Sequence, residues 1–431
     1  PSFQAEDGIR DFLLSLVGSE MCIRDRFLGV LLPATHRALD DAKVTHAIFS
    51  KMYDIAMELP IDVLAEIVRL GDKVAHWNGY GLFFEVLRTR SREKVVQRRT
   101  SPGYYGRLFD VPIEPNAPPL KPSEELLALD IEEVAATLEH GGAFSRHFRH
   151  FEQRPEQVEL LRSITHAISD GQHLLAEAGT GVGKSFAYLV PAALWALTNG
   201  TRVVISTNTI NLQDQLINKD IPDLQEALDI DLRAVVVKGR GNYLCPRRLE
   251  GMRRRGPDTP DEMRVLAKVF VWLQGSTTGD RGEINLNGPI EREVWSRISA
   301  ADEGCSAENC MRRTGGACPF YRTRIAAQSA HLIIVNHALL LADVATGNRV
   351  LPEYDYLIVD EAHHIESATT NALSFRVTQT DIKYLLRELG SSKSGILGRI
   401  LGLLHDAVPP SEFAGLERRV ERCTDHAFQM E

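Results

Sequence analysis

The sequence has no long apolar run, few cysteines and no excess of positive charge, and each of these absences excludes a class of proteins. No apolar run approaches the roughly 18 residues that a membrane-spanning helix needs, so no membrane contact is expected. Six cysteines in 431 residues are too few for a fold held together by disulfides. Positive charge is not in excess, because 49 lysines and arginines against 58 aspartates and glutamates give a net charge of −9. This balance argues against a protein that coats nucleic acid by bulk charge, but it leaves local basic patches open.

The composition is that of a globular protein. With 44% hydrophobic and 25% charged residues, the chain is neither disordered nor fibrous. At roughly 150 residues per domain, its length allows about three domains. We expect a cytoplasmic monomer.

The beginning of the chain does not resemble a natural domain. Residues 5–26 read AEDGIRDFLLSLVGSEMCIRDR, and their apolar piece is too short for the core of a signal peptide and follows acidic residues. The string resembles the conceptual translation of sequencing-library adapters. We therefore interpret residues 1–26 as an artefact and leave Cys22 out of the functional analysis. The remainder is then expected to be a fragment of a longer protein.

Periodicity and composition divide the remainder into parts. Residues 27–100 repeat apolar residues every three or four positions, which predicts helices, and the proline-rich residues 101–125 predict a linker. From residue 126, helical stretches alternate with short apolar runs, which predicts an α/β domain with a parallel sheet covered by helices. A helix is expected over Ser123–Leu138. The candidate strands are 173–178, 202–208, 233–239, 331–337 and 356–362.

An insertion interrupts this α/β domain. Residues 245–325 are rich in Gly, Arg, Asp and Cys and lack candidate strands. The α/β domain is thereby divided into residues 126–244 and 326–368. Residues 369–431 return to helical periodicity.

The segment AEAGTGVGKS at 176–185 has the context of a phosphate-binding loop, between a candidate strand and a helix. Its glycines let backbone N–H groups turn toward phosphate oxygens, and the helix N-terminus adds the positive end of its dipole. Lys184 is expected to reach the β- and γ-phosphates of ATP, and Ser185 to ligate Mg²⁺. Ala178 stands where the pattern usually has its first glycine. The expected nucleotide-binding residues of the loop are Ala178, Gly179, Thr180, Gly181, Val182, Gly183, Lys184 and Ser185.

The segment YLIVDEAHH at 356–364 ends an apolar strand with two acidic residues, a costly placement unless they serve a charge. Asp360 is expected to hold Mg²⁺, and Glu361 to orient and deprotonate the attacking water. His363 fits either a relay between the nucleotide and nucleic-acid sites or a structural histidine. Together with the phosphate-binding loop, these residues predict an ATP hydrolase.

Four cysteines fall in the insertion with the spacing C-x59-C-x4-C-x7-C; they are Cys245, Cys305, Cys310 and Cys318. Four thiolates can hold Zn²⁺ or a [4Fe–4S] cluster. Zinc sites usually contain two closely spaced cysteine pairs, and only one pair here comes close, so zinc is the alternative to iron–sulfur. Cys423 lies outside the pattern.

Arginines surround these cysteines in the sequence and predict a surface that binds single-stranded DNA. The alternative is a charged face that only contacts solvent. They are Arg247, Arg248, Arg253, Arg254, Arg255, Arg312, Arg313, Arg322 and Arg324.

Six segments resemble, in the right order, motifs of the DinG-type helicases, which are relatives of the XPD-like iron–sulfur helicases of superfamily 2. The segments are AEAGTGVGKS, STNTINLQDQL (206–216), VKGRGNYLCPRR (237–248), ACPFYRTR (317–324), IVNHALLLAD (334–343) and DEAHH. The resemblance covers about residues 125–431. It implies a RecA-like P-loop ATPase lobe with an inserted [4Fe–4S] domain, followed by the start of a helical arch.

By the same resemblance, the intact protein is an ATP-dependent DNA helicase of 5′→3′ polarity. It acts on single-stranded and forked DNA in repair or replication. Gln157, in RPEQ, would contact adenine, and residues 207–209 would touch the DNA backbone.

The segment LPATHRALDDAKVT at 32–45 resembles the third motif of DnaQ-like 3′–5′ exonucleases. His36 would be the general base and Asp41 a ligand of catalytic Mg²⁺. The other carboxylates of that family lie upstream, where only the adapter-like string stands. Residues 27–100 are therefore interpreted as the helical remnant of a ribonuclease H-like exonuclease domain, without nuclease activity; a surface His-x4-Asp without a role is the alternative.

No QxxGRxxR-type motif follows the DEAH segment, although a second RecA-like lobe would supply such an arginine. We expect this chain to bind ATP and single-stranded DNA weakly and not to translocate. The principal alternative is a 3′–5′ exonuclease whose helicase part only positions DNA. Two further alternatives are a non-catalytic redox or damage sensor and a DEAH-class RNA helicase, and the cysteine insertion argues against the latter.

Overall fold

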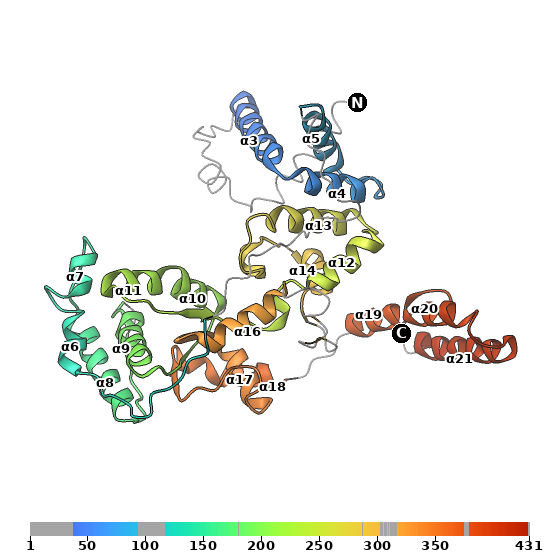
Figure 1. The fold of residues 1–431 in the computed structure, drawn as a ribbon. Helices are drawn as coiled ribbons and strands as arrows, with labels where there is room; N and C mark the ends of the chain where they lie inside the picture. Colours follow the sequence, from blue (N-terminus) through green and yellow to red (C-terminus); the bar gives the residue numbers. More distant parts are fainter. Residues whose placement is uncertain are drawn as a thin grey trace. The chain divides into compact units, whose positions relative to one another are not determined.

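The computed structural model describes residues 38–93, 117–179, 181–286, 288–301, 305, 308, 310, 317–374 and 379–429. Cys22, His36, Thr180, Arg312 and Arg313 lie outside the described residues, as does most of the predicted linker. The chain divides into two compact units, Pro1–Thr369 and Thr370–Glu431 (Figure 1). Among the described residues, no helix is both long enough and apolar enough to cross a membrane.

The first unit contains the predicted parallel sheet. Its strands are β1 (Val203–Thr207), β2 (Ala234–Val236), β3 (Leu332–Asn336) and β4 (Tyr356–Val359), in the order β2-β3-β1-β4. All three pairings are parallel, so the carboxyl ends of the strands share one edge. The α/β class expected from the sequence is confirmed.

The two faces of this sheet belong to two hydrophobic cores. Val203 and Ile205 of β1 point into one core, whereas Val204 points into the other, because successive side chains of a strand alternate. Helices α8 and α9 pack against each other in the first core, and α17 contributes to the second. The helices of the ATPase part are α6 (Ile131–Ala136), α7 (Ala143–His147), α8 (Pro155–Ser169), α9 (Lys184–Asn199), α10 (Ile210–Gln215), α11 (Ile221–Leu228), α16 (Pro319–Ser329), α17 (His337–Ala345) and α18 (Ile365–Leu373).

The strand predicted at residues 173–178 is not formed, and that prediction was wrong. The segment has no assigned strand or helix, and Leu174 and Leu175 are 46% and 95% exposed. Within the described sheet β1 already has a neighbour on each side, whereas β4 pairs with β1 alone. An apolar run becomes a strand only where another strand satisfies its backbone groups, and residues 173–178 pair neither with the open edge of β4 nor with another described strand.

The helix predicted to begin at Ser123 begins later, at Ile131. The Asp130 side chain accepts hydrogen bonds from the N–H groups of Glu132 and Glu133 and thereby caps α6. Before it, the chain lies against the end of α9, where the Asn199 side chain bonds both the N–H and the carbonyl of Leu127. Tertiary contact therefore outweighs helical periodicity in this segment.

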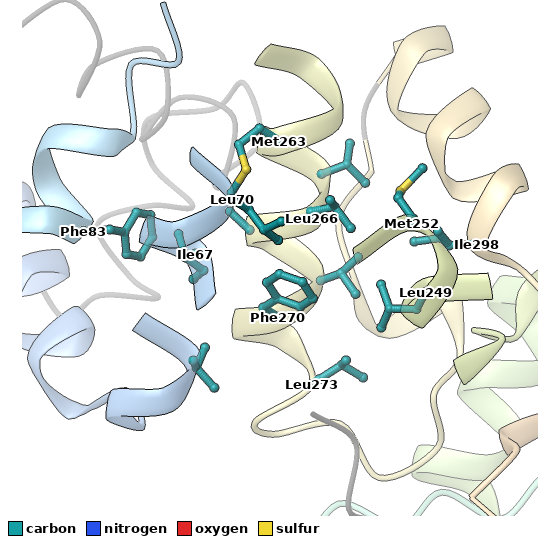
Figure 2. Packing of buried hydrophobic residues seen from close by; sticks show 14 of the residues in the cluster. Ile67, Leu70, Phe83, Leu249, Met252, Met263, Leu266, Phe270, Leu273 and Ile298 are labelled. Atoms are coloured by element: carbon teal, nitrogen blue, oxygen red, sulfur yellow. The ribbon is translucent and has the colours of Figure 1, made fainter. Parts of the chain in front are cut away.

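The N-terminal helices are α3 (Ala38–Glu58), α4 (Ile61–Gly71) and α5 (Tyr80–Glu93). The cysteine insertion contains α12 (Pro246–Arg255), α13 (Pro260–Trp272) and α14 (Gly288–Ile298). Buried residues of α4 and α5 share one hydrophobic core with these three helices (Figure 2).

The second unit has the helical structure expected for the end of the chain. Its helices are α19 (Gln379–Leu389), α20 (Gly395–Leu404) and α21 (Pro410–Gln429). Cys423 lies on α21 and is exposed.

Candidate nucleotide-binding site

The phosphate-binding loop leads directly into α9. Gly181 and Gly183 have φ values of +87° and +88°, a left-handed region that favours glycine. The start of α8 supports this backbone: Arg154 Nη1 donates to the Gly181 carbonyl at 2.6 Å, and Gln157 Nε2 donates to the Gly183 carbonyl at 2.7 Å. A Cβ atom at Gly183 would lie 2.3 Å from Gln157 Nε2. Glycine is therefore favoured at position 183 by its conformation, and a Cβ atom there would also displace the Gln157 amide.

Asp360 continues the sheet one residue beyond β4. Its N–H donates to the Ser206 carbonyl at 2.8 Å, and its carboxylate accepts hydrogen bonds from the Tyr188 hydroxyl and the Glu361 N–H. Burial raises the pKa of Asp360, and the adjacent charge of Glu361 raises it further. Burial likewise raises the pKa of Tyr188 well above its usual value, so Tyr188 is a stable donor. Asp360 is thus a partly desolvated carboxylate that a cation would stabilise.

Lys184 and Glu361 meet across the site, with 2.8 Å between Nζ and Oε1. Their hydrogen bond is the first cause of a raised pKa for Lys184 and a lowered pKa for Glu361. Glu361 has a φ of +55°, which is unusual for a residue other than glycine. Such conformations cost free energy and are concentrated at functional sites. The structure thus brings the predicted lysine of the loop to the predicted catalytic acid.

The other residues predicted for the nucleotide site lie around the Lys184–Glu361 contact or in the loop. Ser185 lies at the start of α9, near Tyr188 and Asp220, and it acts to lower the pKa of both groups. His363 Nδ1 lies 3.5 Å from Glu361 Oε2, and the His363 side chain is 67% exposed. Ala178 and Gly179 lie in the first part of the loop, which has no assigned helix or strand, and Val182 lies later in the loop and is half-buried.

One buried histidine at this edge was missed by the sequence analysis. His337 begins α17 directly after β3, is fully buried, and its Nδ1 lies 2.8 Å from Ser206 Oγ. Burial lowers its pKa, whereas the nearby charge of Asp360 acts in the opposite direction. Its Nε2 is buried without a hydrogen-bond partner among the described residues. His337 therefore packs behind the acidic pair. The signal was present in IVNHALLLAD, because polar residues at the carboxyl end of a parallel strand face the ligand edge.

The segment predicted to touch DNA is only partly accessible. Thr207 is fully buried, and its hydroxyl has no hydrogen-bond partner among the described residues. Asn208 is half-buried and Thr209 is exposed. The Thr209 side chain caps α10 by accepting a hydrogen bond from the Leu212 N–H.

The four predicted cysteine ligands lie near enough to one another for their charges to interact. Cys245 and Cys318 are buried, and each immediately precedes a helix that opens with proline. The Sγ atoms of Cys305 and Cys310 are 3.7 Å apart. Burial is the first cause that raises the pKa of Cys310, to about 12, and the other three thiols contribute. Four thiols suit zinc or iron–sulfur, but no group of three or more candidate ligands among the described residues has the spacing of a metal site.

The arginines around the cysteines have different environments. Arg254 and Arg255 are exposed, whereas Arg253 is buried and pairs with Glu66. Arg248 donates to the carbonyls of Ser299 and Ala301. The prediction that these arginines grip DNA is wrong for Arg253, since its guanidinium faces α4 instead of solvent.

Comparisons with known proteins agree with the nucleotide-site geometry. Residues 155–243 match the DEAD/DEAH box helicase family, and residues 301–382 match the DEAD_2 family. The chain is 31% identical over 388 residues to the 3′-5′ exonuclease DinG of Bacillus subtilis. This alignment covers 89% of this chain and 40% of that protein.

Other relatives carry helicase names. The chain is 33% identical over 256 residues to the ATP-dependent helicase DinG of Mycobacterium tuberculosis, covering 55% of this chain and 38% of that protein. It is 34% identical over 221 residues to the ATP-dependent DNA helicase YoaA of Escherichia coli, covering 50% and 34%. The chain thus spans about two fifths or less of the length of these curated relatives. The two family matches and these relatives show that the chain is similar to DinG-type helicases of superfamily 2.

Proposed function

We propose that this chain contributes the ATP-binding lobe of an ATP-dependent DNA helicase. The observation that carries the proposal is the meeting of Lys184 and Glu361, which are 177 positions apart in the sequence and 2.8 Å apart in space. A loop that can wrap phosphate and a strand end that carries two carboxylates are the two halves of a P-loop ATPase site.

The contacts suggest how the site responds to ATP. Lys184 would exchange its hydrogen bond with Glu361 for the β- and γ-phosphates, and the loop N–H groups would hold the phosphate oxygens. Loss of that hydrogen bond would bring the pKa of Glu361 back toward its usual value, because the bond is the first cause of the lowering. The released carboxylate would then be a better base for the attacking water.

Mg²⁺ is the metal that this chemistry requires, and the donor set fits it. Asp360 and Ser185 would hold the ion with oxygen ligands. When bound, Mg²⁺ neutralises charge on the phosphates. His363 remains a proposed relay on the exposed side of Glu361, and Gln157 a proposed adenine contact, although its amide is seen on the Gly183 carbonyl.

An assay of nucleotide binding and turnover tests this function. We expect the chain to bind a fluorescent ATP analogue in the presence of Mg²⁺ and a Lys184→Ala variant to lose most of this affinity. We expect Glu361→Gln to keep binding. Robust turnover stimulated by single-stranded DNA would contradict the expectation that a second lobe is required, and absence of binding would contradict the ATPase proposal itself.

For the cysteine group we propose a [4Fe–4S] cluster, with zinc as the alternative. Support comes from the proximity of Cys245, Cys305 and Cys318 to Cys310, whose pKa they raise. Cys245 and Cys318 also pack with buried aromatic side chains. Iron and sulfide analysis, together with the visible spectrum of anaerobically purified protein, separates the two. A colourless protein that contains stoichiometric zinc would reject the cluster.

The proposed substrate is single-stranded or forked DNA in a cytoplasmic repair or replication process, with 5′→3′ movement by the intact protein and a monomeric state. The polarity rests on the family resemblance alone. Unwinding of forked substrates with one or the other free tail, by the intact protein, tests the polarity.

The second candidate function is 3′–5′ exonuclease activity of the intact protein. The relative named an exonuclease aligns over 388 residues, more than residues 126–431 can supply, so the alignment includes N-terminal helices. Asp41 lies near the start of α3, whereas His36 lies outside the described residues. We expect no digestion of 3′ ends by this chain alone. Digestion that is lost in Asp41→Ala would contradict this expectation.

A further inference from the structure

The N-terminal helices and the cysteine insertion share one hydrophobic core, although more than 150 positions separate them in the sequence. Figure 2 shows Ile67, Leu70 and Phe83 on one side of this core and residues of α12, α13 and α14 on the other. The insertion contributes Leu249, Met252, Met263, Leu266, Phe270, Leu273 and Ile298. None of the described strand residues belongs to this core.

Both contacting helices have the pattern that this packing requires. In α4 the buried positions Val63, Leu64, Ile67 and Leu70 form a single stripe at helical spacing. Helix α13 is buried on more than one side, because it packs against α14 as well as α4. One of its faces is therefore the docking surface for α4.

A buried ion pair crosses the same interface. Glu66 of α4 and Arg253 of α12 are 2.6 Å apart, and their side chains are only 6% and 10% exposed. Burial acts to raise the pKa of Glu66, but hydrogen bonds from Arg69 and Arg253 outweigh it and hold the pKa below its usual value. A buried carboxylate is costly without a partner. Glu66 can therefore be buried in the docked state only with its cationic partners in place, and Arg253 supplies one of them from the insertion.

We propose that α4 and α5 dock permanently on α12–α14, so that the N-terminal region and the cysteine insertion form one structural unit. The N-terminal region is then carried by the insertion and not by its covalent connection to the ATPase part alone. Since α12 starts at the residue after Cys245 and holds Glu66 through Arg253, the unit links the cysteine group to the N-terminal region. The docking does not depend on the helicase activity proposed above.

Cleavage of the connecting segment tests the docking. In the full chain, residues 103–108 are replaced by the recognition sequence of a specific protease, and the cleaved protein is analysed by size-exclusion chromatography. We expect the two pieces to elute together. In an Ile67→Asp variant we expect them to separate, because the new carboxylate would face the apolar core. Phe84→Asp is the matched control: Phe84 is 45% exposed, next to the buried Phe83, and its variant should stay together.

Variants of the ion pair keep the proposal testable if Ile67→Asp loses helical structure. Arg253→Met alters only the insertion side and leaves Glu66 without this partner, so we expect about a hundredfold weaker retention of the N-terminal piece. The double variant Glu66→Leu/Arg253→Met, which replaces both charges by apolar groups, should restore retention. Separation of the wild-type pieces after cleavage would overturn the proposal, as would retention in both Ile67→Asp and Arg253→Met.

Discussion

The contact between Lys184 and Glu361 predicts that the catalytic acid competes with ATP for the lysine. Both side chains are more than a quarter exposed, so their ion pair is worth only about 0.3–1 kcal/mol. Glu361→Gln removes the negative charge while keeping the size of the side chain. Because the phosphates then no longer displace a carboxylate, we expect the variant to bind ATP about two- to fivefold more tightly than the wild type.

Equilibrium titration with a fluorescent ATP analogue measures this difference. The Lys184→Met variant should bind weakly with or without Glu361→Gln, since the lysine is the shared partner. Glu366→Gln removes the same charge from an exposed position at the start of α18 and should leave affinity unchanged. Added salt should reduce the advantage of Glu361→Gln, because an exposed pair is screened.

The pH dependence provides a second check on the same contact. The pKa of Glu361 is lowered from its usual value of 4.5, first by the hydrogen bond from Lys184. A lowered pKa means that the pair is fully present above pH 4.5 and is lost as the pH falls through the folded-state value. The affinity ratio between variant and wild type should therefore stay constant between about pH 6 and pH 8. Equal or weaker binding by Glu361→Gln in this range would refute the competition.

Three further predictions concern stability. Gly181→Ala and Gly183→Ala should each cost about 1–2 kcal/mol for the left-handed backbone, and Gly183→Ala should cost more in a thermal melt because its Cβ would also meet Gln157. Lys268→Met breaks the buried pair with Glu291, whose side chains are 2% and 4% exposed; we expect a loss of about 3–5 kcal/mol in urea unfolding, largely recovered by adding Glu291→Leu. His331 has a pKa lowered to about 4, first by burial, so stability should be full above pH 6.5 and fall toward pH 4. His331→Asn should flatten this decline in denaturation curves.

The sheet was largely predictable, and its one failure has a physical reason. The runs that became β1, β2, β3 and β4 are apolar and short, as buried parallel strands are. The run at 173–178 has the same pattern but no ladder partner in the described sheet. A pattern of apolar residues reports which segment avoids water, whereas strand formation also depends on a neighbour that the pattern does not identify.

The acidic pair and the loop lysine were predictable because a parallel sheet brings the ends of its strands to one edge. The contacts that surround them were not. The structure shows Gln157 on the loop carbonyl, and His337 on Ser206 behind the acids. Both contacts depend on the rotamers of single side chains in a packed site. Motif spacing constrains where the backbone places such side chains. It does not determine which hydrogen bonds they form.

The docking of α4 on the insertion shows where sequence patterns stop being informative. The apolar stripe of α4 predicts that another element packs on this helix face. Because Glu66 is buried on the same side, a positively charged side chain is expected near it. The chain offers 49 lysines and arginines for this role, and no spacing rule selects among them. Arg253, 187 positions away, becomes the partner because the face of α13 fits α4 and brings α12 to the same place. Shape complementarity between two apolar faces therefore decides which charges meet, and that information exists only once both helices are packed.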